Sequence, residues 1–168
     1  MKSAQDYPED FDGILAGAPA IAFNNLTSWQ GYPLTLTGPN TSSGLISEAM
    51  WDAIHNEILD QCDKLDGAKD GIIEDPDLCQ VRAEALICGK QNTTNCLSPA
   101  QVDVVNKIYT DLYGPSGSLI FPRKNPGSEL GDYALYYAGQ PFSITQVCKS
   151  LLQSLWTSSR FKIITNQT

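Results

Sequence analysis

The sequence lacks the residues and patterns that several functional classes require. It contains a single histidine, His55, and no Cys-x-x-Cys pair, so the usual ligand patterns of a zinc site are missing. No apolar run approaches the roughly 18–20 residues that span a membrane, and no run of lysine and arginine exceeds two residues. The net charge of −8 argues against nucleic acid and against an anionic membrane as partners.

The composition is that of a globular protein. The chain has 168 residues, of which 42% are hydrophobic and 18% are charged. These proportions are typical of a folded domain, and the length is sufficient to bury a substantial core. This length predicts one domain, and no internal repeat is visible.

The cysteines form a cluster and an outlier. Four of them lie close together, at Cys62, Cys79, Cys88 and Cys96, whereas Cys148 stands apart. Because the cluster has neither Cys-x-x-Cys nor cysteine–histidine spacing, it favours disulfides over a zinc site. Disulfides in turn favour an oxidising, extracellular environment.

Glycosylation signals agree with that environment. Asn-x-Ser/Thr triplets begin at Asn25, Asn40, Asn92 and Asn166. The first residues, MKSAQDYPEDF, contain no apolar region of the kind that a signal peptide has. We therefore expect a secreted parent protein whose N-terminal part precedes Met1.

The hydrophobic pattern predicts one strand followed by mostly helical structure. Residues 11–20, FDGILAGAPA, have an apolar run without alternation, which is typical of a strand buried in a parallel sheet. Residues 24–44 are rich in Gly, Pro, Ser, Thr and Asn, which predicts loops. A helix is predicted from the N-cap Ser47 to about Gln61.

A second helix has a clear start signal. Ser98 is a suitable N-cap, Pro99 fits the first helical position, and Gln101 can close a capping box. An apolar stripe follows, made of Val102, Val105, Ile108, Tyr109 and Leu112.

An acidic segment between two cysteines, CDKLDGAKDGIIEDPDLC, is the strongest candidate site. Its aspartates Asp63, Asp66 and Asp70 are spaced by three and four, with glycines after the last two. Oxygen ligands on a loop that can turn sharply suit calcium, although the spacing does not match an EF-hand. Backbone carbonyls of Ala68 and Ile72 could complete the set. The alternative is a solvated acidic loop whose aspartates only form turns.

The chain resembles the tannase and feruloyl esterase family of α/β-hydrolases. The resemblance covers residues 4–129, through YPEDFDGILAGAPA, QCDKLDGAKDGIIEDPDLC, LICGK, CLSPAQVDVVNKIY and PGSE in that order. It implies an α/β fold class: a fragment of an α/β-hydrolase, with one helix end and one parallel strand, then a mostly helical, disulfide-tied lid. The implied domains are a catalytic-domain remnant over 1–22, a lid with a calcium loop over 23–146, and a divergent tail over 147–168.

The resemblance also implies particular residue roles. It implies disulfides between Cys62 and Cys79 and between Cys88 and Cys96, with Cys148 unpaired. It implies a structural calcium ion whose side-chain and carbonyl ligands are Asp63, Asp66, Ala68, Asp70 and Ile72.

The catalytic residues of that family are not found in this sequence. Its members use a Ser-Asp-His triad with the serine on a G-x-S-x-G turn, and no such motif occurs here. The segment GPSGS, residues 114–118, lacks the second glycine at the right spacing. We therefore expect a serine carboxylic ester hydrolase that acts on phenolic-acid esters, present as an inactive fragment. The alternative is a non-catalytic, extracellular, calcium-stabilised binding module.

Other polar and aromatic residues have simpler interpretations. His55 lies on the flank of a helical apolar stripe, which indicates helix packing rather than catalysis. Tyrosines in the segment GDYALYYAGQPF could line an aromatic-acid pocket, but that spacing is more typical of packing; they are Tyr133, Tyr136 and Tyr137. The N-terminal carboxylates fit helix ends and turns; they are Glu9, Asp10 and Asp12.

Overall fold

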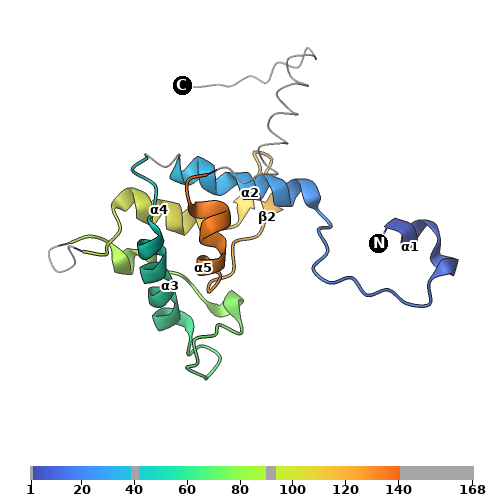
Figure 1. Cartoon of the computed structure of the whole chain (residues 1–168), viewed down its shortest axis with the longest axis horizontal. Coiled ribbons are helices and arrows are strands. Elements are labelled where there is room, and N and C mark those ends of the chain that lie inside the picture. The colour runs from blue at the N-terminus through green and yellow to red at the C-terminus, as the bar shows by residue number, and fades with distance from the viewer. Residues whose placement is uncertain (1, 39–41, 90–93, 141–168) are drawn as a thin grey trace, which may run out of the picture.

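The N-terminal part forms an arm that extends away from a helical body (Figure 1). The computed structural model describes residues 2–38, 42–89 and 94–140. The arm contains the short helix α1 (Lys2–Asp6) and the 3₁₀ turn η1 (Pro8–Asp10), and residues 11–22 form neither helix nor strand. No residue from 2 to 22 is buried.

The predicted strand over residues 11–20 is therefore wrong for this structure. The segment is apolar, yet its large side chains are exposed: Ile14 at 60% and Leu15 at 101%. A strand requires a neighbour to pair its N–H and C=O groups, and no other part of the described chain lies alongside this one.

The predicted loop over residues 24–44 is also wrong, because most of it forms helix α2 (Phe23–Thr37). Gly31 and Pro33 lower its helix propensity. Burial of Trp29, which is 2% exposed, and of Pro33 and Thr37 offsets that cost through packing against the body. The Thr37 hydroxyl donates to the Pro33 carbonyl, so this polar group is satisfied inside the helix.

The two predicted helices are confirmed with their caps. Helix α3 (Glu48–Cys62) begins after Ser47, whose hydroxyl accepts a hydrogen bond from the Met50 N–H. Helix α4 (Pro99–Ile108) begins with a complete capping box between Ser98 and Gln101. Gln101 also donates to the Leu45 carbonyl at 2.8 Å, which ties the start of α4 to the segment before α3.

Short elements connect and follow these helices. The 3₁₀ turns η2 (Pro76–Leu78) and η3 (Ala83–Leu86) lie between α3 and α4. Strands β1 (Leu112–Tyr113) and β2 (Leu119–Phe121) form an antiparallel pair in which Leu112 lies opposite Phe121. Helix α5 (Glu129–Asp132) leads directly into the π-helix η4 (Tyr133–Tyr137).

One hydrophobic core unites the body. Helices α3 and α4 supply most of it, and Tyr137 of η4 closes it by stacking on Trp51 with ring centroids 4.4 Å apart. Helix α5 packs against α3 and η4 packs against α2, so residues distant in sequence enclose the same core (Figure 1). In the described part of the chain, no helix is long and apolar enough to cross a membrane.

Candidate functional site

The acidic loop follows α3 directly and folds around the side chain of Asp63. This residue caps the C-terminal end of α3 and is only 3% exposed. Its Oδ1 atom accepts hydrogen bonds from the N–H groups of Asp70 at 3.3 Å and Gly71 at 3.0 Å. The loop thus returns to its own starting point, which brings Asp63 and Asp70 together.

The other aspartates bind neighbouring backbone groups of the same loop. Asp66 accepts from the Ala68 N–H at 2.8 Å and from the Glu74 N–H at 3.4 Å. Asp70 accepts from the Ile72 N–H at 3.1 Å. The intervening turns require Gly67 and Gly71 at φ values of +99° and +80°, which glycine adopts without strain; a side chain there would be strained.

The donor chemistry of this loop suits calcium, but the carboxylates do not converge. Within the described residues, one carboxylate oxygen each of Asp63 and Asp70, and the carbonyls of Ala68 and Ile72, accept no hydrogen bond. In the same part of the chain, no three His, Cys, Asp or Glu side chains gather closely enough to hold a metal ion. Spare oxygens are therefore present on a folded loop, whereas the complete ligand set remains a prediction.

A disulfide and an arginine close the base of the loop. Cys62 and Cys79 are bonded, with Cα atoms 5.4 Å apart, and both are buried. The Arg123 guanidinium donates to the carbonyls of Cys79 and Pro76, each at 2.8 Å. No sequence pattern predicted this role of Arg123, because Arg123 lies 44 residues after Cys79 in the chain.

The second disulfide closes a neighbouring loop. Cys88 and Cys96 are bonded with Cα atoms 4.9 Å apart. Both pairings are the ones that the family resemblance implies. Cys148 lies outside the described residues.

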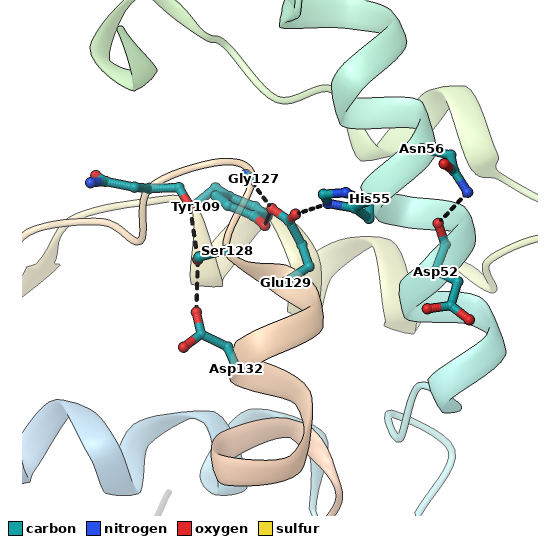
Figure 2. Close-up of polar contacts among 9 residues, drawn as sticks. Asp52, His55, Asn56, Tyr109, Gly127, Ser128, Glu129 and Asp132 are labelled. Atoms are coloured by element: carbon teal, nitrogen blue, oxygen red, sulfur yellow. Dashed lines mark hydrogen bonds and ion pairs between the residues drawn. The ribbon is translucent and has the colours of Figure 1, made fainter. Parts of the chain in front are cut away.

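A second polar cluster, centred on Glu129, was not predicted from the sequence. The Glu129 side chain is completely buried and accepts hydrogen bonds from the Tyr109 hydroxyl and, at 2.8 Å, from the Gly127 N–H. His55 Nδ1 lies 2.7 Å from the other Glu129 oxygen (Figure 2). His55 therefore does more than pack on α3, because it joins α3 to α5.

The Glu129 cluster does not form a catalytic triad. Ser128 precedes Glu129, but its hydroxyl lies 2.9 Å from the Asn125 carbonyl and 2.7 Å from an Asp132 carboxylate oxygen, rather than against His55 (Figure 2). Asp132 is also paired with Lys124 at 2.9 Å. Among the described residues, the sole histidine thus has a carboxylate partner and no hydroxyl nucleophile bonded to it.

Of the tyrosines of η4, Tyr137 lies in the core, and Tyr133 and Tyr136 pack against it. Tyr137 is 1% exposed, and Tyr136 meets the edge of Trp29 with ring centroids 5.5 Å apart. Tyr133 is half-buried and packs against the same core. The packing interpretation of these three residues therefore describes the structure better than a pocket lining.

Two buried phenols have perturbed acidity. Burial, followed by the nearby charge of Glu129, raises the pKa of Tyr109 well above its usual value of 10.0. Burial, followed by the charges of Asp132 and Glu129, likewise raises the pKa of Tyr137. Both phenols therefore remain protonated under ordinary conditions and can donate hydrogen bonds.

The remaining predicted residues are on the surface. Glu9 and Asp10 lie in the first turn of η1, and Asp12 is exposed in the arm, consistent with roles in turns. Asn25 is exposed on α2 and is available to a glycan. The other three glycosylation candidates lie outside the described residues; they are Asn40, Asn92 and Asn166.

Comparison with known families identifies the chain. Residues 1–140 match the family described as "Tannase and feruloyl esterase". The chain belongs to the tannase and feruloyl esterase family. The match includes the arm, the acidic loop, both disulfides and the Glu129 cluster, so each of these features lies within the matched residues.

Relatives within the tannase and feruloyl esterase family are considerably longer than this chain. A protein named probable feruloyl esterase B-1, from Aspergillus oryzae, is 54% identical over 148 residues, which is 86% of this chain and 27% of the relative. A probable feruloyl esterase B from Aspergillus clavatus is 54% identical over 144 residues, which is 84% of this chain and 27% of the relative. The chain therefore spans about a quarter of the length of these relatives.

Solved structures from the family share the fold. The crystal structure of feruloyl esterase B from Aspergillus oryzae superimposes with a TM-score of 0.80 at 54% identity, over 84% of this chain and 29% of that one. The crystal structure of an esterase from Aspergillus oryzae gives a TM-score of 0.85 at 44% identity, over 96% of this chain and 33% of that one. The expected relation to feruloyl esterase structures is confirmed, and the helical body with a small two-stranded sheet is consistent with part of such an enzyme.

Proposed function

We propose that this chain is the lid-bearing portion of a carboxylic ester hydrolase that cleaves phenolic-acid esters. The observation that supports it best is the family match over residues 1–140, together with relatives named feruloyl esterase at 54% identity. The substrate in the intact enzyme would be an ester of an aromatic acid, such as a feruloyl or galloyl ester.

The proposal divides the chain into three parts. Residues 1–22 would belong to the catalytic α/β domain, residues 23–146 to the lid, and residues 147–168 to a divergent tail. The exposed apolar side chains of the arm support the first boundary, since such a surface in a soluble enzyme is normally covered. The separate core of the body supports the second part, because a lid needs a core of its own.

The chemistry of the intact enzyme would be two-step acyl transfer. A serine would attack the ester carbonyl, a histidine would accept the serine proton, and backbone N–H groups would stabilise the oxyanion. The 168-residue sequence contains no G-x-S-x-G motif, and His55 is committed to Glu129. This chain alone should therefore lack esterase activity.

An activity assay tests whether this chain alone lacks esterase activity. The purified 168-residue chain is incubated with methyl ferulate and with methyl gallate, and product is measured by chromatography. Hydrolysis should not exceed the rate in buffer. Turnover that is inhibited by a serine-directed reagent would contradict the proposal, because it would require a nucleophile and base within this chain.

A structural calcium ion in the acidic loop is the second part of the proposal. The ligands would be the side chains of Asp63, Asp66 and Asp70 and the carbonyls of Ala68 and Ile72. The spare oxygens on the loop support it, as does the burial of Asp63, since a buried carboxylate is more stable with a counter-ion. The ion would stabilise the loop and take no part in ester cleavage, which an oxyanion hole accomplishes without a metal.

Metal analysis tests the calcium proposal. After exhaustive dialysis against buffer containing calcium, the chain should retain one calcium ion, measured by atomic emission. Magnesium should compete poorly, because it requires a stricter octahedral geometry. Retention of no ion, or equal retention by an Asp63→Asn variant, would contradict the proposal.

We also propose that the parent enzyme is secreted and glycosylated. The two disulfides support an oxidising environment, and the side chain of Asn25 is exposed. Expression through a secretory pathway should yield a glycan at Asn25, detectable as a mass shift on enzymatic deglycosylation. An Asn25→Gln variant with an unchanged glycan pattern would contradict the assignment of that residue.

A non-catalytic, extracellular, calcium-stabilised binding module is the alternative function. The absence of a G-x-S-x-G motif from the 168 residues favours it. Sequencing the transcript upstream of the Met1 codon distinguishes the two. An in-frame segment that encodes a signal peptide and a G-x-S-x-G motif supports the esterase, whereas a stop codon directly upstream supports the binding module.

A further inference from the structure

The Glu129 carboxylate collects hydrogen-bond donors from three separate parts of the body. Tyr109 lies at the C-terminal end of α4, His55 lies in the middle of α3, and Gly127 lies in the turn that precedes α5 (Figure 2). Glu129 itself is 0% exposed, so these donors, rather than bulk water, satisfy its carboxylate. A buried carboxylate with fewer partners would destabilise the fold, because desolvation of its charge would be uncompensated.

The arrangement indicates which partner carries each proton. A carboxylate can only accept, and Oε1 already accepts from Tyr109 and from Gly127. The remaining oxygen, Oε2, faces His55 Nδ1 at 2.7 Å. If Glu129 is charged, then the Nδ1 atom must carry a hydrogen, and His55 is held as an Nδ1–H donor.

Among the described residues in contact with Glu129, His55 is the one group that can offset the negative charge of the carboxylate. Asp132 lies on the next turn of the same segment, but Lys124 neutralises it at 2.9 Å. Tyr109 and Tyr137 are uncharged phenols, since burial raises the pKa of each. His55 is the remaining titratable group in contact with Glu129 among the described residues.

The cluster lies at the start of a short segment that follows the turn at Gly127. We define residues 129–137, which form α5 and η4, as the strap. The strap contains a single turn of π-helix, a geometry that is rare in proteins. At its far end, Tyr137 stacks on Trp51, so both ends of the strap are anchored to α3.

We propose that the Glu129 carboxylate is a charged latch that closes the strap over α3 and α4 and holds His55 as an Nδ1–H donor. Without the latch, the strap opens locally while the disulfide-tied remainder of the body stays folded. Opening would expose the aromatic cluster beneath the strap, so the latch controls access to that part of the core.

Nitrogen-15 NMR of the single histidine tests the proton assignment in the full 168-residue chain. In the wild type, Nδ1 should carry a slowly exchanging hydrogen. In Glu129→Gln, the Nδ1 signal should change to that of an exchanging or unprotonated nitrogen. An Nε2–H tautomer with bare Nδ1 in the wild type would overturn the proposal, since it would mean that Glu129 is neutral and donates.

Native-state hydrogen exchange tests the latch itself. Loss of a buried, charge-assisted hydrogen bond should raise exchange of strap amides by roughly 10- to 100-fold, with little change in α4. His55→Leu, which removes the donor, should show this increase. His55→Asn should largely prevent it, because its amide nitrogen can occupy the Nδ1 position.

One matched control and one further comparison complete the hydrogen-exchange experiment. Asp52 is exposed on α3, one turn before His55, so Asp52→Asn should leave strap exchange unchanged. If Glu129→Gln does not fold, the comparison of His55→Leu with His55→Asn decides. Equal strap exchange in these two variants, or an increase spread uniformly over α3, α4 and the strap, would overturn the latch.

Discussion

The acidic loop and the Glu129 cluster both gather carboxylate oxygens, but they satisfy them in different ways. In the loop, three aspartates bind N–H groups of their own segment, and oxygens of Asp63 and Asp70 remain without a partner in the described chain. In the cluster, one glutamate receives donors from three distant segments. The acidic loop therefore has free oxygens that could bind a cation, whereas donors from the fold already satisfy the Glu129 carboxylate.

This contrast explains why one carboxylate site is a candidate for binding and the other for structure. A ligand site needs groups that the fold leaves unsatisfied but holds in place. A structural site needs groups that the fold satisfies completely, because any unpaired buried charge reduces stability. The two sites share helix α3, since Asp63 caps its end and His55 lies in its middle.

The largest expected effect on stability follows from removal of the Glu129 carboxylate. Glu129→Ala leaves the buried Tyr109 hydroxyl and the partly buried His55 Nδ1–H without an acceptor, so the free energy of unfolding should fall by about 3–5 kcal/mol. Urea denaturation followed by tryptophan fluorescence measures this change. Asp52→Ala on the exposed side of α3 should change stability by no more than about 0.5 kcal/mol. A loss below about 1 kcal/mol for Glu129→Ala would show that the cluster does not stabilise the fold.

The next effect concerns the closure of the acidic loop. Replacing both Cys62 and Cys79 with alanine should reduce the free energy of unfolding by about 3 kcal/mol, because the unfolded chain regains loop entropy. The same replacement at Cys88 and Cys96 should cost slightly less, since that loop has a sequence separation of 8 rather than 17. Denaturant unfolding of the two variants measures the difference. A markedly greater loss at Cys88 and Cys96 would contradict this ranking.

A smaller effect appears at alkaline pH and involves Tyr109 of the Glu129 cluster. The pKa of Tyr109 is raised in the folded protein, so this phenol keeps its proton while the unfolded one ionises above pH about 10. The unfolded state then binds fewer protons, and the free energy of unfolding should fall by up to about 1.4 kcal/mol per pH unit for this residue. Below pH about 10 its contribution is constant.

Replacement of the phenol provides the control for that pH dependence. Tyr109→Phe should be less stable at neutral pH, because Glu129 loses a donor, but its stability should decline less steeply above pH 10. Urea titrations between pH 8 and pH 11 compare the two slopes. Identical slopes would contradict the assignment of the alkaline loss to Tyr109.

Local signals in the sequence predicted the regular elements of the body and the position of the acidic loop. The caps at Ser47 and Ser98 and the apolar stripe of α4 rely on residues within one or two turns, so they can be read without tertiary information. The disulfide pairing depended instead on the family resemblance, and so did the preference for a calcium site over a solvated loop. The spacing of the aspartates alone left a solvated loop open.

The remaining features depend on contacts that local patterns do not encode. Helix α2 forms despite Pro33 because Trp29 is buried by residues far along the chain, and its ring lies 5.3 Å from that of Phe121. The strand expected over residues 11–20 requires pairing partners that the described chain does not provide. Glu129 resembles a surface residue in sequence, and only the approach of α3 and α4 makes it a buried acceptor.

The central claim is that the acidic loop, unlike the Glu129 cluster, is completed by calcium, and thermal unfolding tests it most directly. With calcium at about 100 times its dissociation constant, the midpoint should rise by roughly 5–10 °C over the chelated sample, because the unfolded loop cannot assemble the ligands. Asp66→Asn and Asp70→Ala should abolish that rise. Asp77→Ala, a change at an exposed carboxylate outside the expected ligand set, should preserve it. An unchanged midpoint on chelation of the folded wild type would show that the loop is only an acidic turn.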